Sequence, residues 1–297
     1  MKTKAFIYII VAGVLWGTSG IFAHYLGAYG LTSLQMTAVR GTVAFICMLG
    51  YVLIAKRDAL RVRPVELLLF FGCGATMFAA AACYFTAMQM TSVSTAVVLM
   101  YTAPIFVMFF SVSFLGERFT WLKSVSVVCM LVGCVLVSGI IGGFSVNVPG
   151  ILMGLASGIT YACYNIFTKI AMQRGCHPIS ATLYSFFFMA LIACCVSDPM
   201  RLFACIAAEP LTVSVLCVGV GVVTYVAPYF LYTLSLRDLP AGTASALSIV
   251  EPMAATLFSC IFLQEQLTWI SGAGIVLILL ATILLSKTEK SCEEAST

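Results

Sequence analysis

Residues 95–121 read TAVVLMYTAPIFVMFFSVSFLGERFTW, and residues 243–269 read TASALSIVEPMAATLFSCIFLQEQLTW. An offset of 148 places Thr95 on Thr243 and makes 11 of the 27 positions identical, including a central proline and a closing Thr-Trp pair. Self-similarity at one fixed spacing indicates an internal repeat, which decides the architecture of a chain. The 297 residues are therefore expected to form two related halves.

The composition predicts that both halves lie in a lipid bilayer. Hydrophobic residues make up 62% of the chain and charged residues 9%, whereas a soluble domain carries about 45–50% and about 25%. A membrane-spanning helix needs about 20 mostly apolar residues, and ten runs meet this need. They cover residues 5–23, 33–54, 66–88, 92–114, 120–139, 149–171, 179–197, 210–235, 241–263 and 268–286. The first run resembles a signal peptide but lacks a cleavage site, so we expect it to be retained.

The Lys and Arg residues predict the orientation of these helices, because loops that stay in the cytoplasm are enriched in them. With the N-terminus inside, the outer loops hold Arg201 alone, and Arg40 lies within the second run. The inner segments hold the other 13, which are Lys2, Lys4, Lys56, Arg57, Arg61, Arg63, Arg118, Lys123, Lys169, Arg174, Arg237, Lys287 and Lys290. The bias predicts a multi-pass protein of the cell (plasma) membrane with both termini cytoplasmic.

Five helices in each half is an odd number, so the second half enters the membrane from the opposite side. The expected fold is an all-α integral membrane protein with ten transmembrane helices, arranged as two inverted five-helix repeats. The expected boundaries are residues 1–140 and 149–286 for the repeats and 287–297 for a disordered cytoplasmic tail. Inverted repeats are typical of transporters, because two related packings give one state open to each side. The alternative is a duplication that serves stability alone.

Two charged side chains lie well inside the predicted helices, away from their ends, where a charge costs about 2.5–3.5 kcal/mol. Glu251 is near the middle of the ninth run and precedes Pro252, which frees a backbone carbonyl. It is a candidate to bind a cationic group or to exchange a proton, or else a structural carboxyl. Arg40, near the outer end of the second run, is a candidate to bind an anionic group, or else reaches the outer headgroups.

Aromatic and amide side chains recur at helical spacing on several runs. Many of them lie near the predicted midplane, away from the interfaces where Trp and Tyr usually collect. Buried hydroxyl groups need partners, so a water-filled cavity is one place for them, and hydrogen bonds within the bundle are the other. With the two charged residues, the candidate substrate-pathway residues are Trp16, Arg40, Tyr84, Tyr101, Tyr161, Tyr164, Asn165, Tyr225, Tyr229, Tyr232 and Glu251.

The remaining polar residues favour structural roles. Glu117 and Glu265 occupy the same position in the two repeats, and each is expected to cap the helix that follows it. The thirteen cysteines form no CxxC pair, so we expect packing residues rather than a metal site or a disulfide framework. The chain has no nucleophile elbow, zinc motif or nucleotide-binding loop, and no basic tail for nucleic acid. We therefore expect no enzyme activity, no cofactor and no nucleic-acid partner.

Several short motifs resemble the EamA-type family of the drug/metabolite transporter superfamily. They are Val14-Leu15-Trp16-Gly17-Thr18, Ala38-Val39-Arg40-Gly41, Leu115-Gly116-Glu117-Arg118-Phe119-Thr120-Trp121, Glu251-Pro252 and Leu263-Gln264-Glu265-Gln266-Leu267-Thr268-Trp269. Their order and spacing carry the resemblance over residues 5–286. Gln264 departs from it, because the family usually has glycine there. The resemblance implies ten helices and a central cavity lined by helices 1, 3, 4, 6, 8 and 9.

The resemblance also implies a function, which is secondary transport of a small metabolite, such as export of an amino acid or a related compound by alternating access. Its partners would be the small-molecule substrate, the lipid bilayer and a possible coupling proton. A nucleotide-sugar or phosphate-ester carrier is an alternative, although such a site needs several Lys or Arg residues for phosphate. A non-transporting membrane interaction protein and a membrane-embedded enzyme are the others. The substrate, the coupling ion and the oligomeric state stay open at this point.

Overall fold

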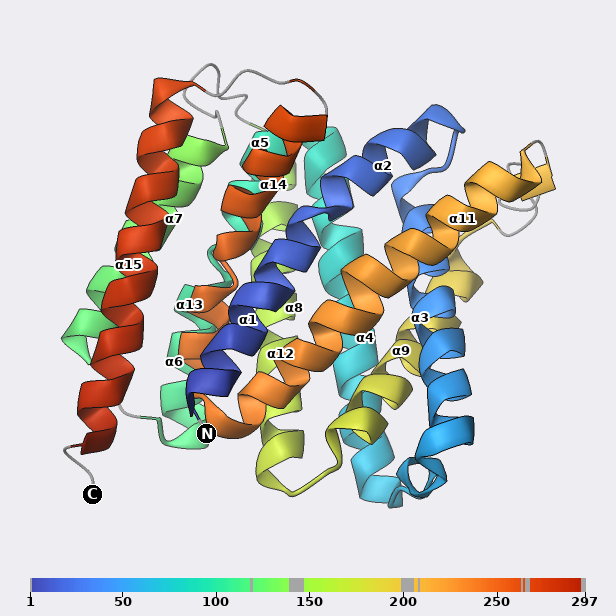
Figure 1. Ribbon diagram of the computed structural model, residues 1–297, viewed down its shortest axis with the longest axis horizontal. Helices are drawn as coiled ribbons and strands as arrows, with labels where there is room; N and C mark the ends of the chain where they lie inside the picture. The colour runs from blue at the N-terminus through green and yellow to red at the C-terminus, as the bar shows by residue number, and fades with distance from the viewer. Residues whose placement is uncertain are drawn as a thin grey trace.

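The computed structural model describes residues 2–117, 120–138, 147–198, 206–207, 209–262, 264 and 268–294. Within these residues every long element is a helix, and the helices form one bundle (Figure 1). They are α1 Lys2–Gly17, α2 Ser19–Ala28, α3 Ser33–Ala55, α4 Pro64–Met90, α5 Val93–Met100, α6 Ala103–Leu115, α7 Trp121–Val137, α8 Val148–Gln173, α9 Pro178–Val196, α11 Pro210–Gly221, α12 Ala227–Asp238, α13 Ala241–Leu247, α14 Val250–Phe262 and α15 Trp269–Glu294. A short 3-10 helix, Arg57–Leu60, precedes α4, and a π-helical turn, Val222–Val226, joins α11 to α12.

These helices make ten membrane spans, as the hydropathy predicts. In the described residues, eight helical stretches are long and apolar enough to cross a bilayer. Two shorter apolar helices, Trp121–Val137 and Trp269–Leu285, complete the set as the fifth and tenth spans. The first span comprises α1 and α2, the fourth α5 and α6, the eighth α11 and α12, and the ninth α13 and α14.

Local sequence explains where many of these helices begin. Proline occupies the first or second position of six of the helices, and at the start of a helix its missing N–H group is no loss. Thr32 and Gln35 form a reciprocal capping box at the start of α3. One predicted end is wrong, because α15 continues to Glu294 where a disordered tail was expected from residue 287. Hydropathy marks where a span leaves the membrane, whereas the Lys and Glu residues that make up most of 287–294 are good helix formers.

The principal contacts between helices are symmetric: each one from the first half to the second has an equivalent contact from the second half to the first. The third span of each half packs along the first span of the other, in the pairs α4–α8 and α12–α1. The fourth spans do the same, in the pairs α6–α8 and α14–α1. The second spans, α3 and α9, pair with each other, and so do the fifth spans, α7 and α15. The predicted architecture of two inverted five-helix repeats is confirmed, and most of the principal helix contacts join one half to the other.

The fifth spans stand together at one edge of the bundle (Figure 1). They cross closely at Gly133 in α7 and Gly274 in α15. A Cβ atom added to Gly133 would lie 2.9 Å from the Gly274 carbonyl oxygen, and one added to Gly274 would lie 2.7 Å from the Gly133 carbonyl oxygen. No real Cβ atom tolerates such distances, so the two glycines permit the helices to touch through their backbones.

The fourth and ninth spans end in the same way, although their sequences differ. Gly116 follows α6 with a φ of 66°, the left-handed conformation that commonly terminates a helix. Gln264, at the equivalent position after α14, has a φ of 58°. The departure from glycine therefore leaves the left-handed φ angle at this position unchanged, and the Cβ atom of Gln264 is accommodated in a conformation that L-residues rarely adopt.

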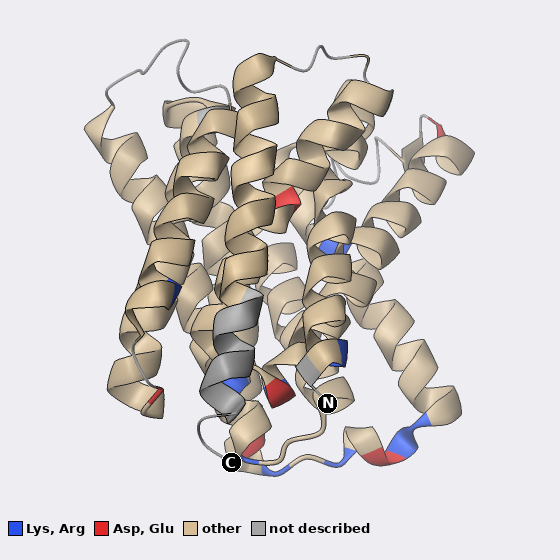
Figure 2. Cartoon of the chain, turned by 60° about the vertical axis from the view of Figure 1, so that its left-hand side comes forward, with Lys and Arg blue, Asp and Glu red and all other residues tan. Residues whose placement is uncertain are grey.

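Most Lys and Arg residues gather at the end of the bundle where the chain begins (Figure 2). This end, here called the basic end, holds the start of α1, the Arg57–Leu60 turn, and the turns that contain Arg174 and Arg237. The other end is called the opposite end. Predictions about Arg118, residues 139–146, Arg201 and Glu265 lie outside the described residues.

Candidate functional site

Three spans are broken near their middles, and each break is bridged by a hydroxyl group. The breaks fall between α1 and α2, between α5 and α6, and between α13 and α14. In each, a Thr or Ser hydroxyl donates to the carbonyl oxygen three residues earlier. The pairs are Thr18 and Leu15 at 2.7 Å, Thr102 and Leu99 at 2.6 Å, and Ser248 and Ser245 at 2.7 Å. Pro104 and Pro252 follow the last two breaks at equivalent repeat positions, so one sequence feature produces both.

A pocket with a volume of about 150 Å³ lies beside these breaks. A cavity of this volume accommodates a small aromatic ring. Its walls come from seven of the ten spans, and its residues on α3 and α4 belong to the halves of those helices nearer the opposite end. Eight of the eleven predicted pathway residues line it, which are Trp16, Arg40, Tyr84, Tyr101, Tyr161, Tyr225, Tyr229 and Glu251. The spans that supply them are the first, second, third, fourth, sixth, eighth and ninth.

The pocket contains one cationic and one anionic side chain. The Arg40 guanidinium projects from α3 over the Tyr225 ring, with its Cζ atom 5.9 Å from the ring centroid. Arg40 is 8% exposed, and its Nε atom is buried without a hydrogen-bond partner. Glu251 lies in the first turn of α14, partly exposed, where its carboxylate faces the Tyr101 hydroxyl and feels the Arg40 charge. The backbone amides at this helix terminus also favour a negative charge.

Aromatic rings form the side of the pocket toward the basic end. The Trp16 ring lies 5.0 Å from the Tyr229 ring between centroids and 5.5 Å from the Tyr232 ring. The Tyr225 and Tyr229 rings are 5.1 Å apart. The Trp16 indole Nε1 atom is buried without a partner. It is therefore a second donor in this wall, beside Arg40, that meets no acceptor of the protein.

The other three predicted pathway residues lie behind the pocket wall. Tyr232 is fully buried, and its hydroxyl has no partner. Tyr164 is buried between Tyr161 and Tyr232, with ring centroids at 6.0 Å and 6.4 Å. The Asn165 amide donates to the Tyr161 carbonyl oxygen at 2.7 Å, while its own oxygen is buried without a partner. Helical periodicity places these side chains on the correct faces but does not give their depth along the pathway.

The sequence reasoning missed several residues of the pocket. Ser19, Thr224 and Ser248 contribute hydroxyl groups to its lining. A signal was available for Ser248, which lies three residues before Glu251 and so on the same helical face. The apolar lining residues carry no such signal, because Met77, Ala80 and Phe85 resemble the lipid-facing residues around them.

Two other structural predictions can be compared with the structure. The expectation that Glu117 caps α7 is wrong. Its carboxylate accepts a hydrogen bond from the backbone of another helix, at Ala241. The cysteines that the structure describes are free thiols. The same residues contain no group of three His, Cys, Asp or Glu side chains that could hold a metal ion.

Comparison with known proteins identifies relatives over nearly the whole chain. The family model of the EamA-like transporter family matches residues 3–139 and again residues 148–287. The uncharacterized transporter YwfM of Bacillus subtilis (strain 168) is 26% identical over 293 residues, which cover 97% of each chain. An uncharacterized transporter of Archaeoglobus fulgidus is 28% identical over 282 residues, or 93% of this chain and 94% of that one. A solved crystal structure superposes with a TM-score of 0.81 at 18% identity, over 99% of this chain and 100% of the other, and shares the fold.

Proposed function

Because the chain belongs to the EamA-like transporter family, we propose that it moves a small zwitterionic metabolite, such as an amino acid, through the central pocket by alternating access. Its place in a membrane-transport family is established by the two family matches and by relatives that are named as transporters. The substrate class, the direction and the coupling ion are the proposal.

The presence of opposite charges in one pocket carries this proposal. Arg40 offers a guanidinium whose Nε donor is unsatisfied, and Trp16 offers a second unsatisfied donor. Buried donors are almost always paired, so these two favour a ligand with an acceptor group, and a carboxylate forms the stronger bonds. Glu251 and the faces of the surrounding tyrosines favour an ammonium group. An α-amino acid carries both groups.

The alternative of a phosphate-ester carrier is less well supported. Phosphate groups are usually held by several Lys or Arg side chains. Arg40 is the one such residue among the described residues that line the pocket. Glu251 would also repel a doubly charged phosphate from the same space. The pocket therefore favours a substrate with a single anionic group.

The orientation and coupling complete the proposal. Loops rich in Lys and Arg stay in the cytoplasm, so we infer that the basic end faces the cytoplasm of a cell whose plasma membrane holds the protein. The pocket then lies toward the external side. Export is the direction that the family resemblance suggests. Glu251 is the candidate proton carrier, since among the described residues it is the acidic side chain that lines the pocket.

Ligand-induced thermal stabilisation of the purified protein tests the substrate class. We expect an amino acid to raise the melting temperature, whereas the matching amine without a carboxylate and the N-acetylated acid do not. Arg40→Gln and Glu251→Gln should each weaken binding at least about tenfold, because each loses a charged hydrogen bond. Arg57→Gln and Glu66→Gln remove the same charges at the basic end and serve as controls. Equal stabilisation by the amine, or no effect of Arg40→Gln, would overturn the proposal.

Transport in proteoliposomes tests the role of Glu251 in coupling. Glu251→Gln keeps the shape of the side chain and removes its charge. Proton-driven uptake should be lost, while exchange of substrate across the membrane continues if the carboxyl group only couples. A structural carboxyl group predicts a lower melting temperature instead. A Gln variant of normal stability with undiminished proton-driven uptake would remove Glu251 from the mechanism.

A further inference from the structure

Two charged side chains of opposite sign hold the turn between α12 and α13 at the basic end. Lys169, on α8, is 7% exposed. Its ammonium donates to the carbonyl oxygens of Leu236 at 2.8 Å and Leu239 at 2.6 Å. These carbonyls terminate α12, where the backbone leaves acceptors unsatisfied and the helix dipole favours a cation. Lys169 therefore caps the end of the eighth span.

Glu117 caps the beginning of the ninth span from the other half of the chain. Its Oε1 atom accepts a hydrogen bond at 2.8 Å from the backbone N–H of Ala241, the first residue of α13. Lys169 belongs to the same half as α12 and α13, whereas Glu117 follows α6 in the first half. If the halves move relative to each other, Lys169 can keep its partners and Glu117 cannot.

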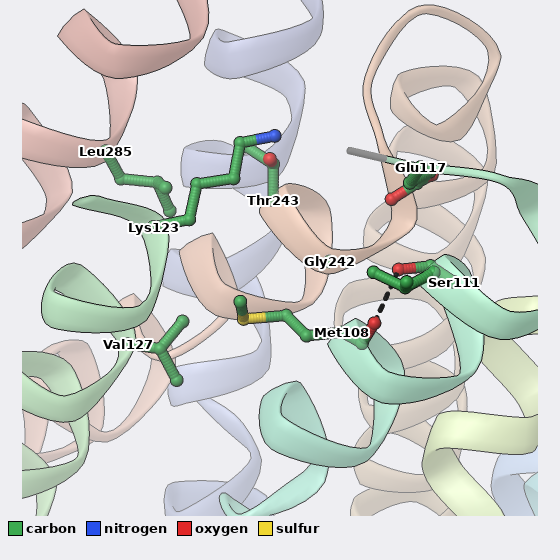
Figure 3. Close-up of a pocket in the computed structure, with 9 residues that line it drawn as sticks. Met108, Ser111, Glu117, Lys123, Val127, Gly242, Thr243 and Leu285 are labelled. Atoms are coloured by element: carbon green, nitrogen blue, oxygen red, sulfur yellow. Dashed lines mark hydrogen bonds between the residues drawn. The ribbon is translucent and has the colours of Figure 1, made fainter. Parts of the chain in front are cut away.

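The helices around Glu117 are packed closely. Figure 3 shows Glu117, Ser111 and Gly242 around a small cavity at the start of α13. Its volume is about 20 Å³, which is room for about one water molecule. A Cβ atom added to Gly242 would lie 3.0 Å from Met108 Cγ, so this glycine lets α13 rest against α6. All residues of α13 are buried. The basic end of the pathway is closed here.

Buried polar atoms without partners lie between this seal and the pocket. They are Tyr232 Oη, Asn165 Oδ1 and Ser245 Oγ. Each lies about one helical turn nearer the basic end than a residue that lines the pocket, namely Tyr229, Tyr161 and Ser248. Buried groups of this kind need an explanation. Exposure to water in a second conformation supplies one, because it satisfies all three.

We propose that Glu117 is a positioning residue that ties the α12–α13 turn, which Lys169 holds within the second half, to the first half and thereby keeps the basic half of the pathway closed. Release of Ala241 by Glu117 separates α13 from α6 and lets water reach Tyr232, Asn165 and Ser245. The gate rests on the proposed transport by alternating access. Opening at the basic end must then be accompanied by closure at the opposite end, since the two repeats exchange conformations.

Hydrogen–deuterium exchange of the ligand-free protein in nanodiscs tests this gate. In Glu117→Gln we expect the amides of α13 to exchange several-fold faster, because the neutral amide oxygen of glutamine accepts a weaker hydrogen bond from Ala241 than the carboxylate does. The amides of residues 91–96, which form the equivalent turn at the opposite end, should exchange several-fold more slowly. A local cap would show only the first change, so acceleration confined to α13 would overturn the gate, as would no change.

Two matched controls separate gating from ordinary capping. Glu66 accepts from the Arg63 backbone N–H at 2.9 Å, a helix cap within one half. The Arg57 side chain donates to the Leu53 carbonyl oxygen at 2.7 Å, a local counterpart of Lys169. Glu66→Gln and Arg57→Met should leave residues 91–96 unchanged, and so should Lys169→Met, because the hydrogen bonds of Lys169 lie within the second half. A reciprocal response in either control would also overturn the proposal.

Ala241→Pro provides an independent variant if Glu117→Gln does not fold. It deletes the N–H donor at the first position of a helix, where proline is accepted, and Pro240 already has the extended conformation that must precede a proline. The same reciprocal pattern is expected, and its absence counts against the gate. Because exchange is measured without ligand, a failed gate leaves the substrate proposal standing, and a failed substrate screen leaves this result intact.

Discussion

Tyr84 and Tyr232 occupy the same position in the two repeats but lie in different surroundings. Tyr84 lines the pocket and is partly exposed. Tyr232 is fully buried, and its hydroxyl group finds no partner among the side chains around it. Both residues end up on the third span of their repeat, so the repeated sequence alone would give them equal environments. The difference shows that two halves with related sequences are in unequal conformations.

The short helices that begin the fourth and ninth spans differ in the same sense. All residues of α13 are buried, whereas Val93 at the start of α5 is 58% exposed. These helices are equivalent under the offset of 148 residues. One end of the bundle is therefore packed like a protein core, and the other leaves room for a pocket. We infer that the exchange of these two environments is the conformational change of transport.

Truncation of the two tyrosines should give the largest difference in stability. Tyr232→Ala removes a fully buried ring and should lower the free energy of unfolding by about 3–5 kcal/mol. Tyr84→Ala removes a partly exposed ring and should cost about 1 kcal/mol or less. Unfolding titrations in mixed micelles measure both values. Equal losses would show that the two ends are packed alike.

A pair of glycines one turn apart should sharpen the comparison along the first span. A Cβ atom on Gly17 would lie 2.7 Å from Ala254 Cβ and 2.8 Å from the Ala255 nitrogen, so Gly17→Ala should cost about 1–3 kcal/mol. Gly20, nearer the opposite end, has nothing within 4 Å of such an atom. Gly20→Ala should stabilise the protein by about 0.5 kcal/mol. Thermal unfolding of the two variants checks whether the close approach of the first span to α14 ends between these residues.

The smallest expected effect comes from the two left-handed residues that end the fourth and ninth spans. Gln264→Gly should raise the free energy of unfolding by about 1 kcal/mol, because glycine adopts this conformation without strain. Gly116→Ala should lower it by a similar amount for the same reason. The same unfolding titrations apply. If Gln264→Gly is neutral or destabilising, the two loops are not equivalent in energy even though their φ angles agree.

Much of the fold could be predicted because a bilayer leaves the chain few choices. Backbone groups in lipid must be paired internally, so ten apolar runs give ten helices, and the offset of 148 gives their inverted arrangement. The breaks at the fourth and ninth spans were harder to predict. Pro104 and Pro252 marked their neighbourhood, but the π-helical turn before Pro228 has no counterpart in α4 at the equivalent position.

The candidate site was predicted in part, and the missing part has a physical reason. Polar and charged residues within apolar runs are costly, so Arg40 and Glu251 were recognisable from the sequence. Whether a side chain lines the pocket or lies behind its wall was not recognisable. Helical periodicity shows which face of a helix carries the side chain, but not which conformation the whole protein adopts. Tyr232 and Tyr229 share a face, and packing in this conformation alone separates them. The role of Glu117 was missed because its partner, Ala241, is a backbone group 124 residues away.

The crossing of α7 and α15 also bears on how such a chain assembles. The offset of 148 carries Gly133 onto Ala281 and Ser126 onto Gly274, and both Ala281 and Ser126 are buried. In an antiparallel pair that meets at Gly133 and Gly274, seven residues along each helix bring Ser126 beside Ala281. Each half thus presents the same small-residue face to the other, as the subunits of a twofold homodimer do. A chain with only one such five-helix unit would already carry the small-residue face that both partners of this contact need. The link between the halves makes permanent an antiparallel pairing that these faces themselves specify.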